Sequence, residues 1–380
     1  MKKSVIVCLI AALGLLAACE NTIRYEYDST DGQITILSQM YTSQTEHSIV
    51  LSMSYPDRVD SLPGATVVCY VNDARYTARQ QPVPLEEYYW YDPASGEVLM
   101  EMRPRQQKFT EYRFSARIQP GDEVRVEASK GSLKAWAQVT VPQPARLVKV
   151  DTATVVRTVN YTDLDGSYTW EDTFLDVSAT IRDVPGVDSY FTLTASSLTE
   201  GEIRSYWSDG SVENTEPYRS EDIDLRYETF HDKILEDGFS AGEGNGFLSE
   251  LLPTNEMHCF SDKEFRDGEA TVHPSFEADR LYPVENGTIY WSVPPGAIGE
   301  FHTVFRVHLR TIDRAFYNYL RAINNMETYG YDVTPIIEPT MLPCNVTGGF
   351  GMVSVAADET VVFDLGTSIV DRRDDDPLYY

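Results

Sequence analysis

The stretch Pro120-Gly121-Asp122-Glu123-Val124-Arg125-Val126-Glu127-Ala128 decides the class of fold. A turn signal leads into apolar and charged residues that alternate with a period of two. This period is typical of a strand with one buried and one solvated face. The run Ala135–Val141 alternates in the same way. Alternating runs divided by Gly, Pro and Asp turns favour an antiparallel sandwich.

Three earlier runs extend the pattern toward the N-terminus. They are Ile34–Met40, Ile49–Met53 and Ala65–Val71, and Leu62-Pro63-Gly64 supplies a turn before the third. Pro142-Gln143-Pro144 then interrupts the alternation. We therefore predict an N-terminal immunoglobulin-like β-sandwich over residues 33–144, in a chain that is mainly β.

The remainder, 145–380, predicts a larger, second β-sandwich-like domain with long loops and one or two helices. Strands are expected at 147–159, 173–182, 189–196, 301–310, 352–355 and 360–365. Asp163-Leu164-Asp165-Gly166 is expected to form a hairpin turn, because Asp-Gly tolerates positive φ. A helix is expected at 313–329, where Asp313 can cap an apolar period of three to four. The acidic, glycine-rich stretch 200–285 is expected to be a loop insertion.

The N-terminus has the layout of a bacterial lipoprotein signal. Lys2 and Lys3 precede an apolar run that ends in Leu16-Ala17-Ala18-Cys19. The run is shorter than the roughly 20 residues of a membrane-spanning helix. We predict a signal peptide over 1–18, a tether over 19–32, and acylation of Cys19 by fatty acids such as palmitate. Cys19 would thus anchor the protein in a membrane.

The formal net charge of −28 limits the partners. Binding of nucleic acid needs clustered Lys and Arg, so nucleic acid is not an expected partner. The acids are scattered along the chain, which favours a role in solubility over attraction to cations or to a basic partner.

The cysteines and histidines predict no metal or other cofactor. Cys69, Cys259 and Cys344 remain after the predicted signal and lipid site. A disulfide between Cys259 and Cys344 is one interpretation, and buried free thiols are the other. His302 and His308 share a strand face but lie roughly 20 Å apart, too far to share one metal.

No nucleophile or phosphate-binding motif is present, so we do not expect an enzyme. The aromatic groups Tyr88, Tyr89, Trp90 and Tyr206, Trp207 stand in loop-like contexts and are candidate ligand-binding residues. Packing in a core or at a strand edge is the alternative role for each aromatic. A glycan- or peptide-acting hydrolase with a carboxylate pair in the second domain stays open, as does a structural or adhesive surface protein.

Taken in order, several segments resemble the DUF4249 family of envelope lipoproteins, a domain of unknown function. The resemblance covers most of the chain after Cys19, and the glycine-rich run near the C-terminus is its most telling mark. The segments are Leu62–Val67, Pro120–Val126, Val141-Pro142, Phe260–Lys263, Asp267-Gly268, Val304–Leu309, Phe316–Leu320 and Asn345–Gly351.

The resemblance implies a two-part β lipoprotein of the outer membrane, without saying which face of that membrane it occupies. It also implies a non-enzymatic accessory or ligand-binding role beside a TonB-dependent transporter or another envelope protein. It supplies no catalytic residues.

Overall fold

The computed structural model describes residues 32–373, apart from 57, 93–96, 164–165, 208, 226, 230–231, 239–254, 282–287 and 330–341. The predicted signal peptide and Cys19 therefore lie outside the described residues. Strands dominate the described chain and its sheets are sandwich-like, so the predicted mainly β class is confirmed.

The first sandwich places one sheet over another around an aliphatic core. The upper sheet contains β4 (Thr66–Val71), β5 (Ala74–Thr77), β10 (Glu123–Lys130) and β11 (Leu133–Thr140). The facing strands are β1 (Gln33–Tyr41), β2 (Glu46–Ser54), β3 (Val59–Ser61), β6 (Arg79–Gln80) and β9 (Thr110–Ser115). Val124 and Val126 are fully buried between the sheets, as their alternation with charged residues predicts.

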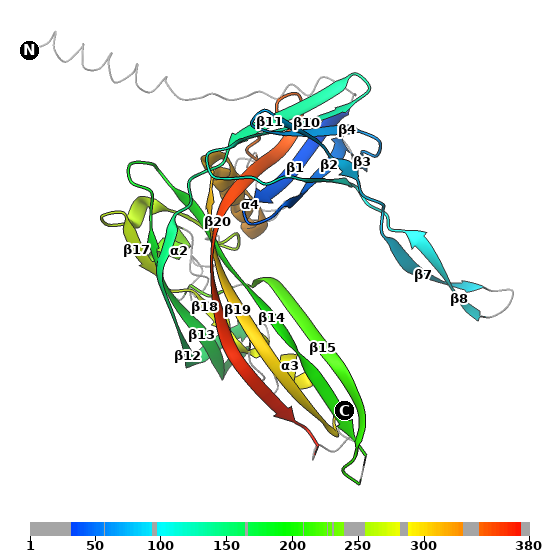
Figure 1. Ribbon diagram of the computed structural model, residues 1–380, viewed down its shortest axis with the longest axis vertical. Helices are drawn as coiled ribbons and strands as arrows, with labels where there is room; N and C mark the ends of the chain where they lie inside the picture. The colour runs from blue at the N-terminus through cyan, green and yellow to red at the C-terminus, as the bar shows by residue number, and fades with distance from the viewer. Residues whose placement is uncertain are drawn as a thin grey trace, which may run out of the picture.

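The C-terminal strand β20 (Phe350–Asp371) joins the two halves of the molecule (Figure 1). Its first part pairs in parallel with β1, from Thr35↔Phe350 to Tyr41↔Ala356. Its second part pairs antiparallel with β19 (Ala297–Ile312). The two short strands expected at 352–355 and 360–365 are therefore one long strand. A ten-stranded sheet results, with the main order β15-β14-β19-β20-β1-β2-β9-β6.

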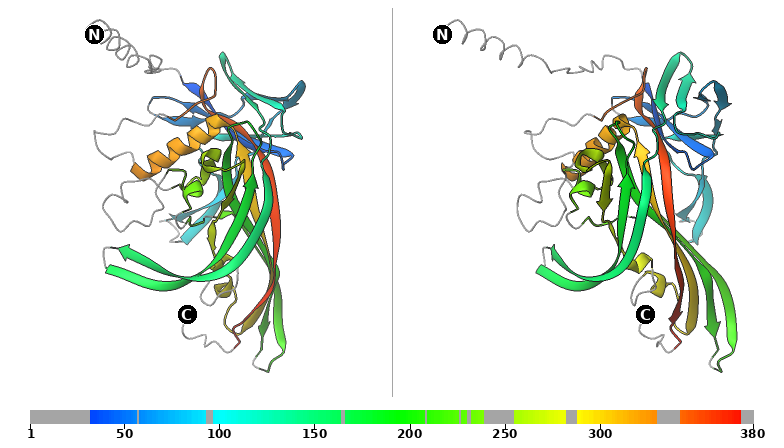
Figure 2. Two further views of the ribbon diagram at one scale, coloured as in Figure 1. Left: turned by 90° about the vertical axis from the view of Figure 1, so that its left-hand side faces the viewer. Right: turned by 60° about the vertical axis from the view of Figure 1, so that its left-hand side comes forward.

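The second sandwich packs a smaller sheet against β14 (Tyr190–Tyr206) and β19. The smaller sheet contains β12 (Arg146–Asp163), β13 (Gly166–Arg182), β17 (Glu269–Val272) and β18 (Ser275–Glu277), and β16 (Cys259–Ser261) pairs with β14. Leu175 and Val177 of β13 meet Phe305 and Val307 of β19 in the buried core. Asp163 pairs with Gly166, so β12 and β13 form the expected hairpin, which curves away from the body in Figure 2.

The stretch predicted as a loop insertion is partly a long hairpin. β14 continues to Tyr206, and the chain returns as β15 (Val212–Leu225). Most side chains of β15 face solvent because it is an edge strand, so its sequence lacks the alternation that reveals a half-buried strand. Short elements follow the hairpin: α2 (Lys233–Glu236), η1 (Asp262–Glu264), η2 (Ala278–Arg280) and α3 (Thr288–Trp291).

The expected helix after the β19 strand is present as α4 (Arg314–Tyr329). The Asp313 carboxylate accepts a 3.0 Å hydrogen bond from the Phe316 amide, which caps the helix start. Phe316 and Tyr317 pack with Cys259 and Met352 in a separate core cluster. None of the helices in the described ranges is long and apolar enough to cross a membrane.

Two strands stand apart from both sandwiches. β7 (Leu85–Asp92) and β8 (Glu97–Pro104) pair with each other in a two-stranded sheet. Figure 1 shows this hairpin projecting from the first sandwich.

Candidate functional site

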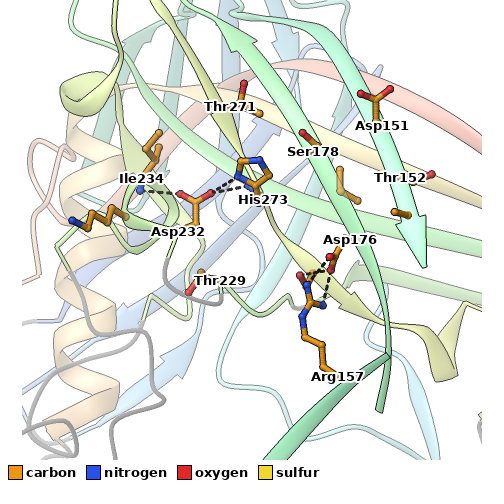
Figure 3. Close-up of a pocket in the computed structure, with 14 residues that line it drawn as sticks. Asp151, Thr152, Arg157, Asp176, Ser178, Thr229, Asp232, Ile234, Thr271 and His273 are labelled. Atoms are coloured by element: carbon orange, nitrogen blue, oxygen red, sulfur yellow. Dashed lines mark hydrogen bonds and ion pairs between the residues drawn. The ribbon is translucent and has the colours of Figure 1, made fainter. Parts of the chain in front are cut away.

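A groove of about 670 Å³ crosses the second sandwich on the face of β13 that is turned away from the core (Figure 3). Asp176 and Ser178 line it, while their neighbours Leu175 and Ala179 are buried in the core. This placement follows from the period of two along β13. The other lining residues are Asp151, Thr152, Ala153, Arg157, Val177, Thr229, Asp232, Lys233, Ile234, Thr271, His273 and Ser275.

One end of the groove holds a closed polar triad. Arg157 on β12 binds both carboxylate oxygens of Asp176, at 2.7 and 2.5 Å, and Ser275 donates to the same carboxylate at 2.7 Å. Burial alone would raise the pKa of Asp176, but the hydrogen bonds from Arg157 and Ser275 outweigh it and hold the pKa below its usual range. Asp176 is therefore an ionised, fully engaged carboxylate.

The other end is organised by Asp232, whose side chain is nearly buried. One carboxylate oxygen caps α2 by accepting from the amides of Ile234 at 3.0 Å and Leu235 at 3.3 Å. The other accepts from the His273 amide at 2.7 Å and lies 3.4 Å from His273 Nδ1. Figure 3 shows the contacts of Asp232 with Ile234 and His273, which tie the wall formed by α2 to the link between β17 and β18 that carries His273.

The groups of the lining that can bind a ligand are hydroxyls, the exposed carboxylate of Asp151 and one cation. Thr152, Ser178 and Thr229 offer hydroxyls, and Lys233 supplies a positive charge at the rim. A second hollow of about 420 Å³ shares Lys233, Ile234 and Thr271 with the groove, and extends it past Thr180 and Glu269. The combined surface can hydrogen-bond an extended polar ligand.

None of the described lining residues of this groove is one of the aromatic candidates from the sequence. Tyr88, Tyr89 and Trp90 belong to β7, and their side chains are outside the described part. Tyr206 ends β14 and Trp207 follows at the tip of the β14–β15 hairpin, with 56% of its surface exposed. The expectation that these residues stand in loops is wrong for all but Trp207, because the chain before each turn stays paired as strand.

The three cysteines in the described part of the chain are free thiols. Cys69 lies in the first sandwich, Cys259 lies under α4, and Cys344 packs against the core of the first sandwich. Of the two interpretations that the sequence leaves open, the structure therefore has the free thiols and not a Cys259–Cys344 disulfide, because the two side chains pack against different core clusters.

The two strand histidines have separate partners. His302 contacts Asp364 at 2.9 Å, and His308 lies between Ser196 at 2.8 Å and Thr360 at 3.0 Å. Across the described ranges, no group of three or more His, Cys, Asp and Glu side chains is gathered to hold a metal ion.

Sequence reasoning missed the groove because its residues come from four separated segments, 151–157, 176–178, 229–234 and 271–275. One local signal was available. Asp232 directly precedes Lys233-Ile234-Leu235, a pattern that favours a helix cap.

Fold and groove together define a two-sandwich β protein with a polar groove on its second sandwich. The chain belongs to the DUF4249 family, described as a domain of unknown function, which matches residues 20–361. No curated protein matches the chain.

Proposed function

We propose that this protein is a non-enzymatic, lipid-anchored accessory of the outer membrane, which binds a polar ligand or cargo segment beside a TonB-dependent transporter. The observation that carries the binding role is the state of the two inner carboxylates of the groove. Asp176 is ionised, pairs with Arg157 and accepts a hydrogen bond from Ser275, and Asp232 accepts hydrogen bonds from the amides of α2 and of His273.

This state favours binding over catalysis. A glycan hydrolase needs one carboxyl group that keeps its proton near neutral pH and a second that acts on the same substrate. The pKa of Asp176 is lowered instead of raised. The pKa of Asp262 is raised by burial and by Asp183, but Asp262 lines neither hollow of the groove.

The envelope part of the proposal rests on the sequence. Leu16-Ala17-Ala18-Cys19 has the order of an acylation signal, and the family match begins directly after Cys19. The net charge of −28 makes independent attachment to an anionic lipid surface unfavourable, so a covalent lipid is the consistent anchor.

The test is purification of the tagged full chain from detergent-solubilised membranes of the native cells. We expect it in the outer-membrane fraction together with a transporter, and Cys19→Ala should move it to the soluble fraction. Recovery of the protein with Cys19 intact from the outer-membrane fraction, but without any envelope partner, would contradict the accessory role.

The hydrolase alternative needs a separate assay. Envelope glycans and peptides incubated with the purified protein should stay intact. Turnover that disappears in Asp176→Asn or Asp232→Asn, but not in Asp151→Asn, would overturn the non-enzymatic assignment.

A further inference from the structure

The β7–β8 hairpin has no supporting layer from the part of the chain that the structure describes. Its strands form eight Cα partner pairs, from Leu85↔Pro104 to Asp92↔Glu97, and its base is closed by the Arg105 amide donating to Pro84 at 2.9 Å. No third strand joins it within the described chain, and its described residues enter none of the four core clusters. A hairpin standing alone in water is marginally stable.

The hairpin nevertheless has two different faces. Leu85, Met100 and Met102 are 58%, 53% and 48% exposed, and the register with strand alternation places these positions on one face, which also carries Glu87 opposite Met102. Glu86, Glu101 and Arg103 occupy positions on the opposite face, where Arg103 binds Glu101 at 2.9 Å. A mainly apolar face that no part of the described chain covers is typical of an interaction surface.

The chemistry of this face favours a protein partner. Methionine side chains are flexible and polarisable, and surfaces that contain them adapt to the shape of a partner. The segment 85–104 contains five acids, Glu86, Glu87, Asp92, Glu97 and Glu101, against the single base Arg103, which gives a formal charge of −4.

This charge argues against two other occupants. An anionic lipid leaflet would repel the hairpin, because such surfaces attract basic segments. A second copy would bring like charges together at the contact, which is unfavourable. A partner protein whose surface has an apolar centre and a basic border would pack against the exposed Met side chains and attract the acids of the hairpin.

We propose that the β7–β8 hairpin is the docking arm of this protein, and that it inserts its Leu85, Met100 and Met102 face into an apolar, basic-rimmed cleft of an envelope protein. The proposal deepens the accessory function, on which it rests, by naming the contact surface and the chemistry of the partner.

The first experiment maps the contact in living cells. A photo-crosslinking phenylalanine analogue replaces Met100 or Met102 in the full chain, and Val362 serves as the control position. Val362 is 58% exposed on β20, so it matches the hairpin positions in accessibility. We expect both hairpin positions, but not the control, to crosslink one envelope protein, which mass spectrometry then identifies.

The second experiment measures affinity for that purified protein. The double variant Met100→Thr/Met102→Thr keeps strand propensity but removes apolar area, so its affinity should fall about tenfold or more. Val362→Thr should leave affinity unchanged, and added salt should weaken binding of the unmodified protein. The thermal unfolding midpoint of the double variant should not change, because the hairpin lies outside the cores.

Several results would overturn the docking arm. In the crosslinking experiment they are crosslinks from the hairpin to lipid or to a second copy, no crosslink at all, and equal crosslinking from Val362. In the affinity experiment they are an affinity that does not change when the two methionines are replaced, and an affinity that does not change with salt. If a transporter still copurifies with the double variant, the accessory function stands and the docking arm alone fails. If no envelope protein copurifies with the protein that carries no substitution, the accessory function itself fails.

Discussion

Asp237 and Arg321 form an ion pair of 2.6 Å that joins the residue after α2 to the middle of α4. Ser261 donates to the same carboxylate at 3.0 Å, and the Tyr317 hydroxyl donates to it as well. Asp237 also has a φ of 45°, in the left-handed region. This cluster fixes α2, and α2 carries Lys233 and Ile234 into the groove.

Replacing Asp237 should therefore loosen the groove wall. Asp237→Ala removes the acceptor of Arg321 and also places alanine at positive φ, so we expect a loss of about 2–4 kcal/mol in the free energy of unfolding. Asp237→Asn keeps a carbonyl acceptor and a residue type that tolerates this backbone, so its loss should be smaller. Urea unfolding of the two variants is the measurement, and equal losses would contradict the backbone contribution.

The glycine-rich run at the start of β20 should be intolerant of a side chain at Gly351. Gly351 has a φ of +113°, and a Cβ there would lie 2.0 Å from the Ile36 carbonyl oxygen. Gly351→Ala would push β20 away from β1 and should cost about 3 kcal/mol or more in unfolding free energy.

Gly366→Ala is the matched control for that change. Gly366 also has a positive φ, +84°, but its added Cβ would meet nothing within 4 Å. The loss of unfolding free energy in Gly366→Ala should therefore come from backbone strain alone, about 1–2 kcal/mol. If the Gly351→Ala protein is as stable as the Gly366→Ala protein, then β1 and β20 can separate enough at Ile36 and Gly351 to accommodate a side chain.

The three thiols should differ in reactivity. Burial raises the pKa of both Cys69 and Cys259 to about 12, whereas Cys344 is only half-buried. In a soluble chain that begins at Glu20, a thiol reagent should modify Cys344 first and should reach the other two only after unfolding. A count of one thiol under denaturing, non-reducing conditions would instead reveal a disulfide.

Acid should weaken the contact between Asp176 and Arg157. The folded-state pKa of Asp176 is lowered, so its contribution to stability is present above the ordinary pKa of a carboxyl group. That contribution disappears as the pH falls through the folded-state value. Asp176→Asn should cost about 1 kcal/mol at neutral pH after allowance for solvent screening.

The pH dependence separates this effect from a packing defect. The stability difference between Asp176→Asn and the unmodified protein should shrink in urea titrations at strongly acid pH. Asp151→Asn is the control, because its partner Lys149 is exposed and such surface pairs contribute little. A difference that stays constant with pH would exclude the charge of Asp176 as the cause.

Local pattern was sufficient for several elements that bury one face and expose the other, although it was not used to predict β9, which has the same alternation. The alternation around Val124 predicted β10 and its buried face, and Asp313 with the apolar period after it predicted α4. It failed at β15, whose Pro217 and many acids face solvent on an edge. It also could not find the groove, because Arg157, Asp176 and Ser275 meet only after β12, β13 and β18 pair.

The sequence by itself determined the mainly β class, the burial period of the strands and the capped helix, because these depend on neighbours within a few residues. Tertiary structure decided that β20 pairs with β1 in parallel and then with β19, that Cys259 and Cys344 stay apart, and that the groove carboxylates are already occupied. The physical reason is that hydrogen bonding between strands is the same for every sequence. Partner choice therefore depends on packing between residues that are distant along the chain.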